Sequence, residues 1–172
     1  MAFDLELINA FYGAATNVLG AELGTLVRRG PLELRQSDVV FGELNALIAV
    51  TGDYQGYILF ELDELLARKL TARMLDQDTL LLKPSLIESA MGELGNMIVG
   101  HANAELEEAG RQIRALPPEV ITGRNTIIRP RKDTRLRIPI ELGLGHFDIE
   151  VSEDQKDESD SLGFSQGGAA QT

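Results

Sequence analysis

The middle of the chain reads Ser85-Leu86-Ile87-Glu88-Ser89-Ala90-Met91-Gly92-Glu93-Leu94-Gly95-Asn96-Met97-Ile98-Val99-Gly100-His101. At about 100° of rotation per residue, the apolar side chains of this run gather on one broad helical face. The other face carries Ser89, Glu93, Asn96, Gly100 and Asn103. Pro84 favours a helix start and Gly110 favours a helix end, so the pattern predicts one long amphipathic helix between them.

The polar face of this helix has the character of a site. Glu93 and Asn96 are three residues apart, so their side chains are neighbours. Gly92, Gly95 and Gly100 surround them, although a glycine inside a helix costs on the order of 1 kcal/mol relative to alanine. Missing side chains let another protein approach closely. The same pair on an exposed helix is also common as plain solvated surface, and that alternative stays open.

The rest of the chain falls into two halves with the same order of elements. In the first half, helical spacing covers residues 5–27, and strand composition follows at 39–41, 44–50 and 57–62, before a helix at 63–75. In the second half, the long helix is followed by strand-like runs at 120–121, 126–128, 134–142 and 146–151. Consecutive strands joined by hairpins predict an α+β, pseudo-symmetric domain, with long helices packed on one face of an antiparallel sheet.

Domain bounds follow from the same pattern. Residues 1–152 are expected to form a single domain, with repeats at about 3–76 and 84–152. Residues 153–172 are acidic and then glycine-rich, which is typical of a disordered tail.

Composition excludes several classes of protein. The 172 residues carry a formal net charge of −11, which argues against nucleic-acid binding. Cysteine is absent, which excludes disulfides, thiolate metal sites and cysteine nucleophiles. The start of the chain lacks the basic region of a secretory signal, and its apolar runs are too short to span a bilayer. We therefore expect a cytoplasmic protein without membrane insertion.

The order Ser89-x-x-x-Glu93-x-x-Asn96-x-x-x-Gly100 resembles the active-site helix of the CheC, CheX and FliY family of chemotaxis phosphatases. The first helix and the two long hairpins also fall where that fold places them, so the resemblance covers about residues 3–151. Asn17 stands where a second motif would end, but Ala14 replaces its glutamate. A single working site makes the chain most like CheX.

The resemblance implies a phosphatase that acts on the phosphoaspartate of a CheY-like response regulator, in chemotaxis or related two-component signalling. Glu93 and Asn96 would be the catalytic residues, with Asn96 orienting the attacking water and Glu93 pairing with a lysine of the partner. Ser89, Gly92 and Gly100 would contact the partner. No metal or cofactor is expected on this chain, because the regulator carries its own Mg²⁺. The family also implies a homodimer.

Two alternatives from other classes remain open at this stage. The chain could be a non-catalytic adaptor that binds a response regulator or a flagellar switch component, or an orphan domain that shares only the fold.

The two histidines and a basic cluster are predicted to have no role in the site. His101 is expected on the apolar face of the long helix, and His146 on the surface after a tight turn. A basic cluster is predicted to lie in a solvated hairpin or loop, and this is favoured over a docking site for an acidic partner. Its members are Arg124, Arg129, Arg131, Lys132, Arg135 and Arg137.

Overall fold

A computed structural model describes residues 3–36, 39–40, 42–123, 127–128 and 134–153. Its helices are α1 (Leu5–Leu23), α2 (Glu64–Leu75), the short 3-10 helix η1 (Thr79–Leu81) and α3 (Pro84–Glu108). Their starts follow from local sequence. Asp4 accepts a hydrogen bond from the Leu7 amide at 3.1 Å, and Asp63 caps α2 in the same way at 2.7 Å. Pro84 opens α3 at a position where its missing amide hydrogen has no intrahelical partner.

One antiparallel sheet contains most of the strands. Its central strands are β4 (Leu44–Gly52), β5 (Gly56–Leu62), β9 (Thr134–Leu142) and β10 (Gly145–Glu153). Beyond β9 lie β1 (Arg28–Arg29) and β2 (Glu33–Gln36), and beyond β4 lie β6 (Ile113–Ala115) and β7 (Glu119–Thr122). A separate pair is formed by β3 (Val39–Val40) and β8 (Ile127–Ile128).

The sheet order is internally symmetric. The path runs β1-β9-β10-β5-β4-β6, and exchanging each strand of the first half for its counterpart gives the same path read backwards. The edge strands of each half thus pair with the long hairpin of the other half. The repeat bounds at residues 3–76 and 84–152 stay a prediction.

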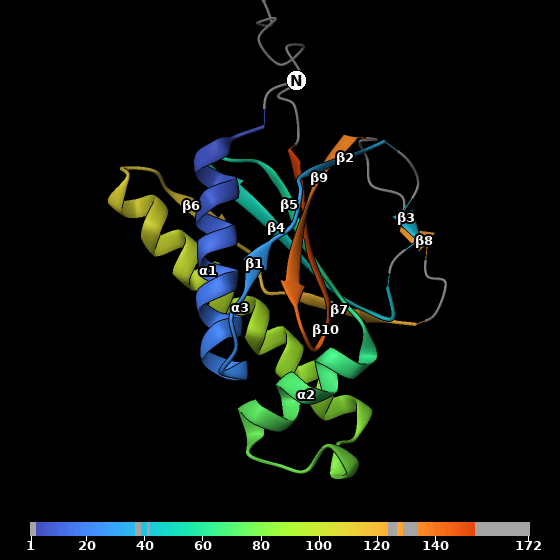
Figure 1. The fold of residues 1–172 in the computed structure, drawn as a ribbon. Helices are drawn as coiled ribbons and strands as arrows, with labels where there is room; N and C mark the ends of the chain where they lie inside the picture. The colour runs from blue at the N-terminus through green and yellow to red at the C-terminus, as the bar shows by residue number, and fades with distance from the viewer. Residues whose placement is uncertain (1–2, 37–38, 41, 124–126, 129–133, 154–172) are drawn as a thin grey trace, which may run out of the picture.

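The helices pack on one side of this sheet. Figure 1 shows α1 and α3 crossing on that side, with α2 at one end of the sheet. Alternate side chains of the central strands point toward the helices, and Ile48, Ile58, Phe60, Phe147 and Ile149 are each at most 1% exposed. This arrangement confirms the predicted α+β fold.

Some predicted bounds are wrong. The first helix ends at Leu23, because Gly24 adopts a left-handed φ of 63° and closes the helix, so residues 24–27 are not helical. Leu5 and Leu26, near the two ends of the predicted helix, are 67% and 81% exposed. The short strands β1, β2 and β6 and the helix η1 were not predicted. The expected tail begins one residue too early, because Glu153 is the last residue of β10. Phe41, Thr126 and residues 154–172 lie outside the described residues.

Charged side chains line the sheet face that points away from α1 and α3. Arg135 Nε donates to Glu150 Oε2 at 2.9 Å, and the two side chains are 1% and 0% exposed. Arg137 pairs with Asp148 and also donates to Glu33 at 2.8 Å. The prediction of a solvated basic cluster is therefore wrong for Arg135 and Arg137, since cross-strand carboxylates hold both. Its other four members lie outside the described residues.

His146 extends this chain of charges to the end of β10. Its Nε2 lies 2.7 Å from Asp148 Oδ2, and the hydrogen bond raises the pKa of His146 above 6.5, although partial burial acts in the opposite direction. Glu61 raises this pKa further and Arg137 lowers it. The half-exposed side chain agrees with its predicted place at the surface.

We expect this pair to make stability depend on pH. A pKa that is raised in the folded state stabilises the protein below pH 6.5, and the gain is lost as the pH rises through the raised value. Urea unfolding at several pH values should show the free-energy difference between wild type and His146→Gln shrinking over that range. His101→Gln is the control, because it leaves Asp148 untouched. A difference that grows with pH would contradict this linkage.

Candidate active-site helix

One face of helix α3 packs in the core, and the opposite face is exposed to solvent. Ala90, Leu94 and Ile98 are each at most 5% exposed, and α3 packs against α1 and α2. Ser89, Glu93, Asn96 and Gly100 are all exposed on the face that does not enter the core. The structure therefore brings four of the five predicted site residues together on one solvent-facing surface.

The three glycines of α3 have different surroundings. A Cβ on Gly95 would lie 3.2 Å from Pro118 Cγ, so this glycine allows close packing of α3 on the chain before β7. Gly92 is half-buried, and its Cβ would meet Val120 Cγ2 at an ordinary 3.7 Å. A Cβ on Gly100 would have nothing within 4 Å. Packing within the described chain therefore gives no reason for glycine at residue 100.

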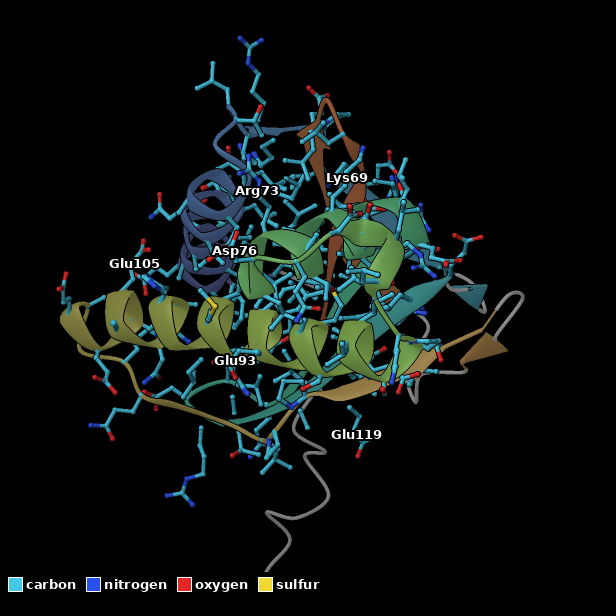
Figure 2. All side chains as sticks on the ribbon, turned by 90° about the horizontal axis from the view of Figure 1, so that it is seen from below. Lys69, Arg73, Asp76, Glu93, Glu105 and Glu119 are labelled. Atoms are coloured by element: carbon cyan, nitrogen blue, oxygen red, sulfur yellow. The ribbon has the colours of Figure 1, made fainter. Side chains whose placement is uncertain are left out.

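The carboxylates of α3 point in different directions. Figure 2 shows Glu93 on the edge of α3 that faces away from α1 and α2, whereas Glu105 lies on the edge toward α1. Glu105 Oε2 would be 3.4 Å from a Cβ on Gly13 of α1. Glu93 is thus the carboxylate positioned to meet an approaching molecule beside Asn96.

Helix α1 does not repeat this arrangement. Asn17 is exposed, but Ala14 is only 2% exposed and belongs to the core. A glutamate at residue 14 would be buried there, so α1 could present the amide without the carboxylate. This geometry favours a single Glu-x-x-Asn site.

His101 is exposed on α3, so the prediction that it lies on the apolar face is wrong. Helical spacing places it near Leu94 and Ile98, but burial at this end of the helix is confined to residues such as Ala102 and Leu106. Helical spacing predicts the direction in which a side chain points. It does not predict how far along the helix the neighbouring elements extend to bury that side chain.

A groove beside Asn96 was missed by the sequence reasoning. Its volume is about 290 Å³, and it separates Val99 and Gly100 of α3 from Leu116 and Pro117 on the chain between β6 and β7. We call it the Asn96 groove. The only sequence signal was Leu116 followed by two prolines, an exposed apolar residue at a rigid position.

Two further observations concern the described part of the chain. Three or more histidine, aspartate or glutamate side chains do not gather there in a group that could hold a metal ion. None of the helices described here has the length and apolar character needed to span a membrane.

An internally symmetric α+β domain with an exposed Glu-x-x-Asn helix is the class of protein that the resemblance predicted. The family model described as chemotaxis phosphatase CheX matches residues 44–141, which include all of α3. This match covers more than half of the chain. The chain belongs to the CheX family, which confirms the resemblance.

Individual relatives agree with this assignment. The CheY-P phosphatase CheX of Thermotoga maritima is 27% identical over 150 residues, which cover 87% of this chain and 96% of that protein. A crystal structure of a chemotaxis protein CheX from Desulfovibrio desulfuricans is 28% identical with a TM-score of 0.75, covering 87% of this chain and 99% of that one. The same fold, at 19% identity and a TM-score of 0.70, occurs in the crystal structure of the CheX-CheY-BeF3-Mg²⁺ complex from Borrelia burgdorferi, with coverage of 86% and 97%.

Proposed function

We propose that this chain is a phosphatase that hydrolyses the phosphoaspartate of a CheY-like response regulator, called the regulator below. The observation that carries the proposal is the exposed pair Glu93 and Asn96 on α3, in a chain whose relative in Thermotoga maritima is a CheY-P phosphatase. Water attacks phosphorus, the bond to the aspartate oxygen breaks, and inorganic phosphate leaves the regenerated carboxylate.

The two side chains have different roles in this reaction. The Asn96 amide can accept a hydrogen bond from the attacking water through its carbonyl and donate through its NH₂ group. An acyl phosphate is already activated, so holding the water in line supplies most of the catalysis. Glu93, one turn away, pairs with a basic side chain of the regulator and fixes the docking register. Ser89, Gly92 and Gly100 form the contact surface around them.

Mg²⁺ belongs to the regulator in this proposal. The ion would neutralise the phosphoryl oxygens, and this chain would supply only the water-orienting amide and the docking carboxylate. With this substrate we also propose a cytoplasmic location, because a response regulator would be met there.

The proposal is tested by following phosphate release from a phosphorylated regulator with and without this protein. We expect release to speed up in proportion to the amount of protein added. Tight binding with an unchanged lifetime of the phosphorylated regulator would instead support a non-catalytic adaptor. If the protein neither binds any regulator of the same genome nor speeds its phosphate release, the chain is an orphan domain that shares only the fold.

Gly100→Ala should have opposite effects on the stability of the free protein and on its docking with the regulator. Alanine favours the helix, so the free energy of unfolding should rise by up to about 1 kcal/mol, since nothing within 4 Å opposes the new Cβ. At regulator concentrations below KM, the rate of phosphate release should fall severalfold, because the methyl group stands where the regulator docks. Urea unfolding and phosphate release measure the two effects.

A matched control for this glycine lies on α1. At Gly20 an added Cβ would make only ordinary contacts, at 3.5 Å to Thr25 and 3.9 Å to Val27. Gly20→Ala should stabilise the protein without slowing turnover. A Gly100→Ala protein that is both more stable and fully active would show that residue 100 has no part in docking.

We propose in addition that the chain forms a homodimer. The edge strands β2 and β7 have one hydrogen-bonding side paired in the described sheet, and edge strands commonly recruit a second chain. A monomeric mass in solution at micromolar concentration would count against this assembly.

A further inference from the structure

The Asn96 groove is continuous with the catalytic surface. Asn96 lines it together with Val99 and Gly100, so the groove borders the residue that is proposed to hold the water. Its opposite wall is formed by Ala115, Leu116 and Pro117. Any molecule that covers Asn96 with an extended surface therefore also covers this groove.

The lining of the groove is uncharged. The chain has a formal net charge of −11, and α3 itself carries five glutamates, yet none of the described residues that line the groove is charged. Leu116 is 52% exposed beside it. A neutral, partly apolar hollow in an acidic surface favours a neutral apolar side chain and would not repay the dehydration of a charged one.

The far wall is anchored before any partner arrives. The Leu116 amide donates to the Ala49 carbonyl at 2.9 Å, and the two following prolines restrict the backbone. Pro118 packs against Gly95, where an added Cβ would lie only 3.2 Å away. A preformed wall loses little conformational freedom on binding, so contacts to it contribute fully to affinity.

We infer that the Asn96 groove receives an apolar side chain of the regulator, with Leu116 as its main contact, and that it sets affinity and not the chemical step. The inference rests on the proposed function. The occupant is the regulator because Asn96 forms part of the groove: a second copy or another segment of this chain seated there would cover the water-orienting amide and block turnover.

Leu116→Asn tests this inference, because it replaces an apolar side chain with a polar one of similar size and no charge. KM for the phosphorylated regulator should rise about tenfold, with kcat within about twofold of wild type. Added salt should not change the ratio of the variant's KM to the wild-type KM, because neither side chain is charged. Leu80, which is 89% exposed on η1, provides the matched control: Leu80→Asn should keep the wild-type KM.

A second variant approaches the groove from the other wall. Gly100→Leu adds a side chain at a residue that lines the groove, where nothing within 4 Å opposes the new Cβ, and should also raise KM. Circular dichroism and urea unfolding confirm that each variant is folded.

The outcomes separate the two hypotheses. Suppose that both groove variants keep the wild-type KM while Asn96→Ala loses activity. The inference about the groove would then be wrong, and the proposed phosphatase function would stand. An unchanged KM with a loss of dimer mass would assign the groove to a second copy, which also overturns the inference. An Asn96→Ala protein as active as wild type would instead remove the proposed function.

Discussion

An Asn96→Ala protein should release phosphate from the phosphorylated regulator about a hundredfold more slowly than wild type. The methyl group can neither accept a hydrogen bond from the attacking water nor donate one, so the water loses its in-line position. Because Asn96 is exposed on α3 and lies outside the core, the free energy of unfolding should change by no more than about 0.5 kcal/mol. Binding of the regulator should persist through Glu93, so the loss should fall on kcat.

Asn17→Ala is the matched control for this loss. Asn17 is an exposed asparagine on α1, and the residue three positions before it is the buried Ala14, so α1 itself supplies no Glu-x-x-Asn pair. We expect Asn17→Ala to keep the wild-type rate. A comparable loss in both variants would reveal a second working amide and contradict the single-site interpretation. A wild-type rate in Asn96→Ala would mean that the chemistry lies elsewhere.

The elements predicted well are those whose signals are local. Asp63 caps α2, and the left-handed Gly110, with φ of 79°, follows α3. Both residues act on the backbone within one helical turn, so the sequence is sufficient to place these ends. The site helix belongs to the same group, since the exposure of Glu93 and Asn96 follows from the spacing of the apolar residues that bury the opposite face.

Features that depend on distant partners were missed. Strand β1 has only two residues, and its register with β9 pairs Arg28 with Glu141, more than 100 positions along the chain. No local preference marks so short a segment as a strand. The Asn96 groove has the same origin: it exists because the chain around Leu116 returns to lie beside α3.

Burial of charge was the largest error, and its reason is physical. Side chains alternate between the two faces along β9 and β10, and Arg135 and Glu150 point away from the helices. This alternation does not reveal that both side chains are buried, because their burial depends on the strand register that joins them by a hydrogen bond of 2.9 Å. A buried charge is tolerated only with a partner, and partners on different strands are not visible in either strand alone.

Replacing Glu150 should therefore have the largest effect on stability. Glu150→Ala removes a counter-charge from the Arg135 guanidinium, which is 1% exposed, and from Arg35, which lies 3.5 Å from the same carboxylate. Removing one member of a buried pair costs about 3 to 5 kcal/mol, a large share of the roughly 5 to 15 kcal/mol that holds a domain together. Urea unfolding should show this loss as a lower midpoint.

An exposed pair of the same length gives the control. Arg68 and Glu64 lie 2.9 Å apart on α2, with side chains 34% and 49% exposed, and Glu64→Ala should cost no more than about 0.5 kcal/mol. The double variant Arg135→Met with Glu150→Leu should recover most of the stability lost in Glu150→Ala, because it removes both charges and keeps apolar volume. If Glu150→Ala costs no more than Glu64→Ala, water reaches Arg135 and this face of the sheet is not closed. If the double variant fails to recover, the loss comes from packing and not from the lost ion pair with Glu150.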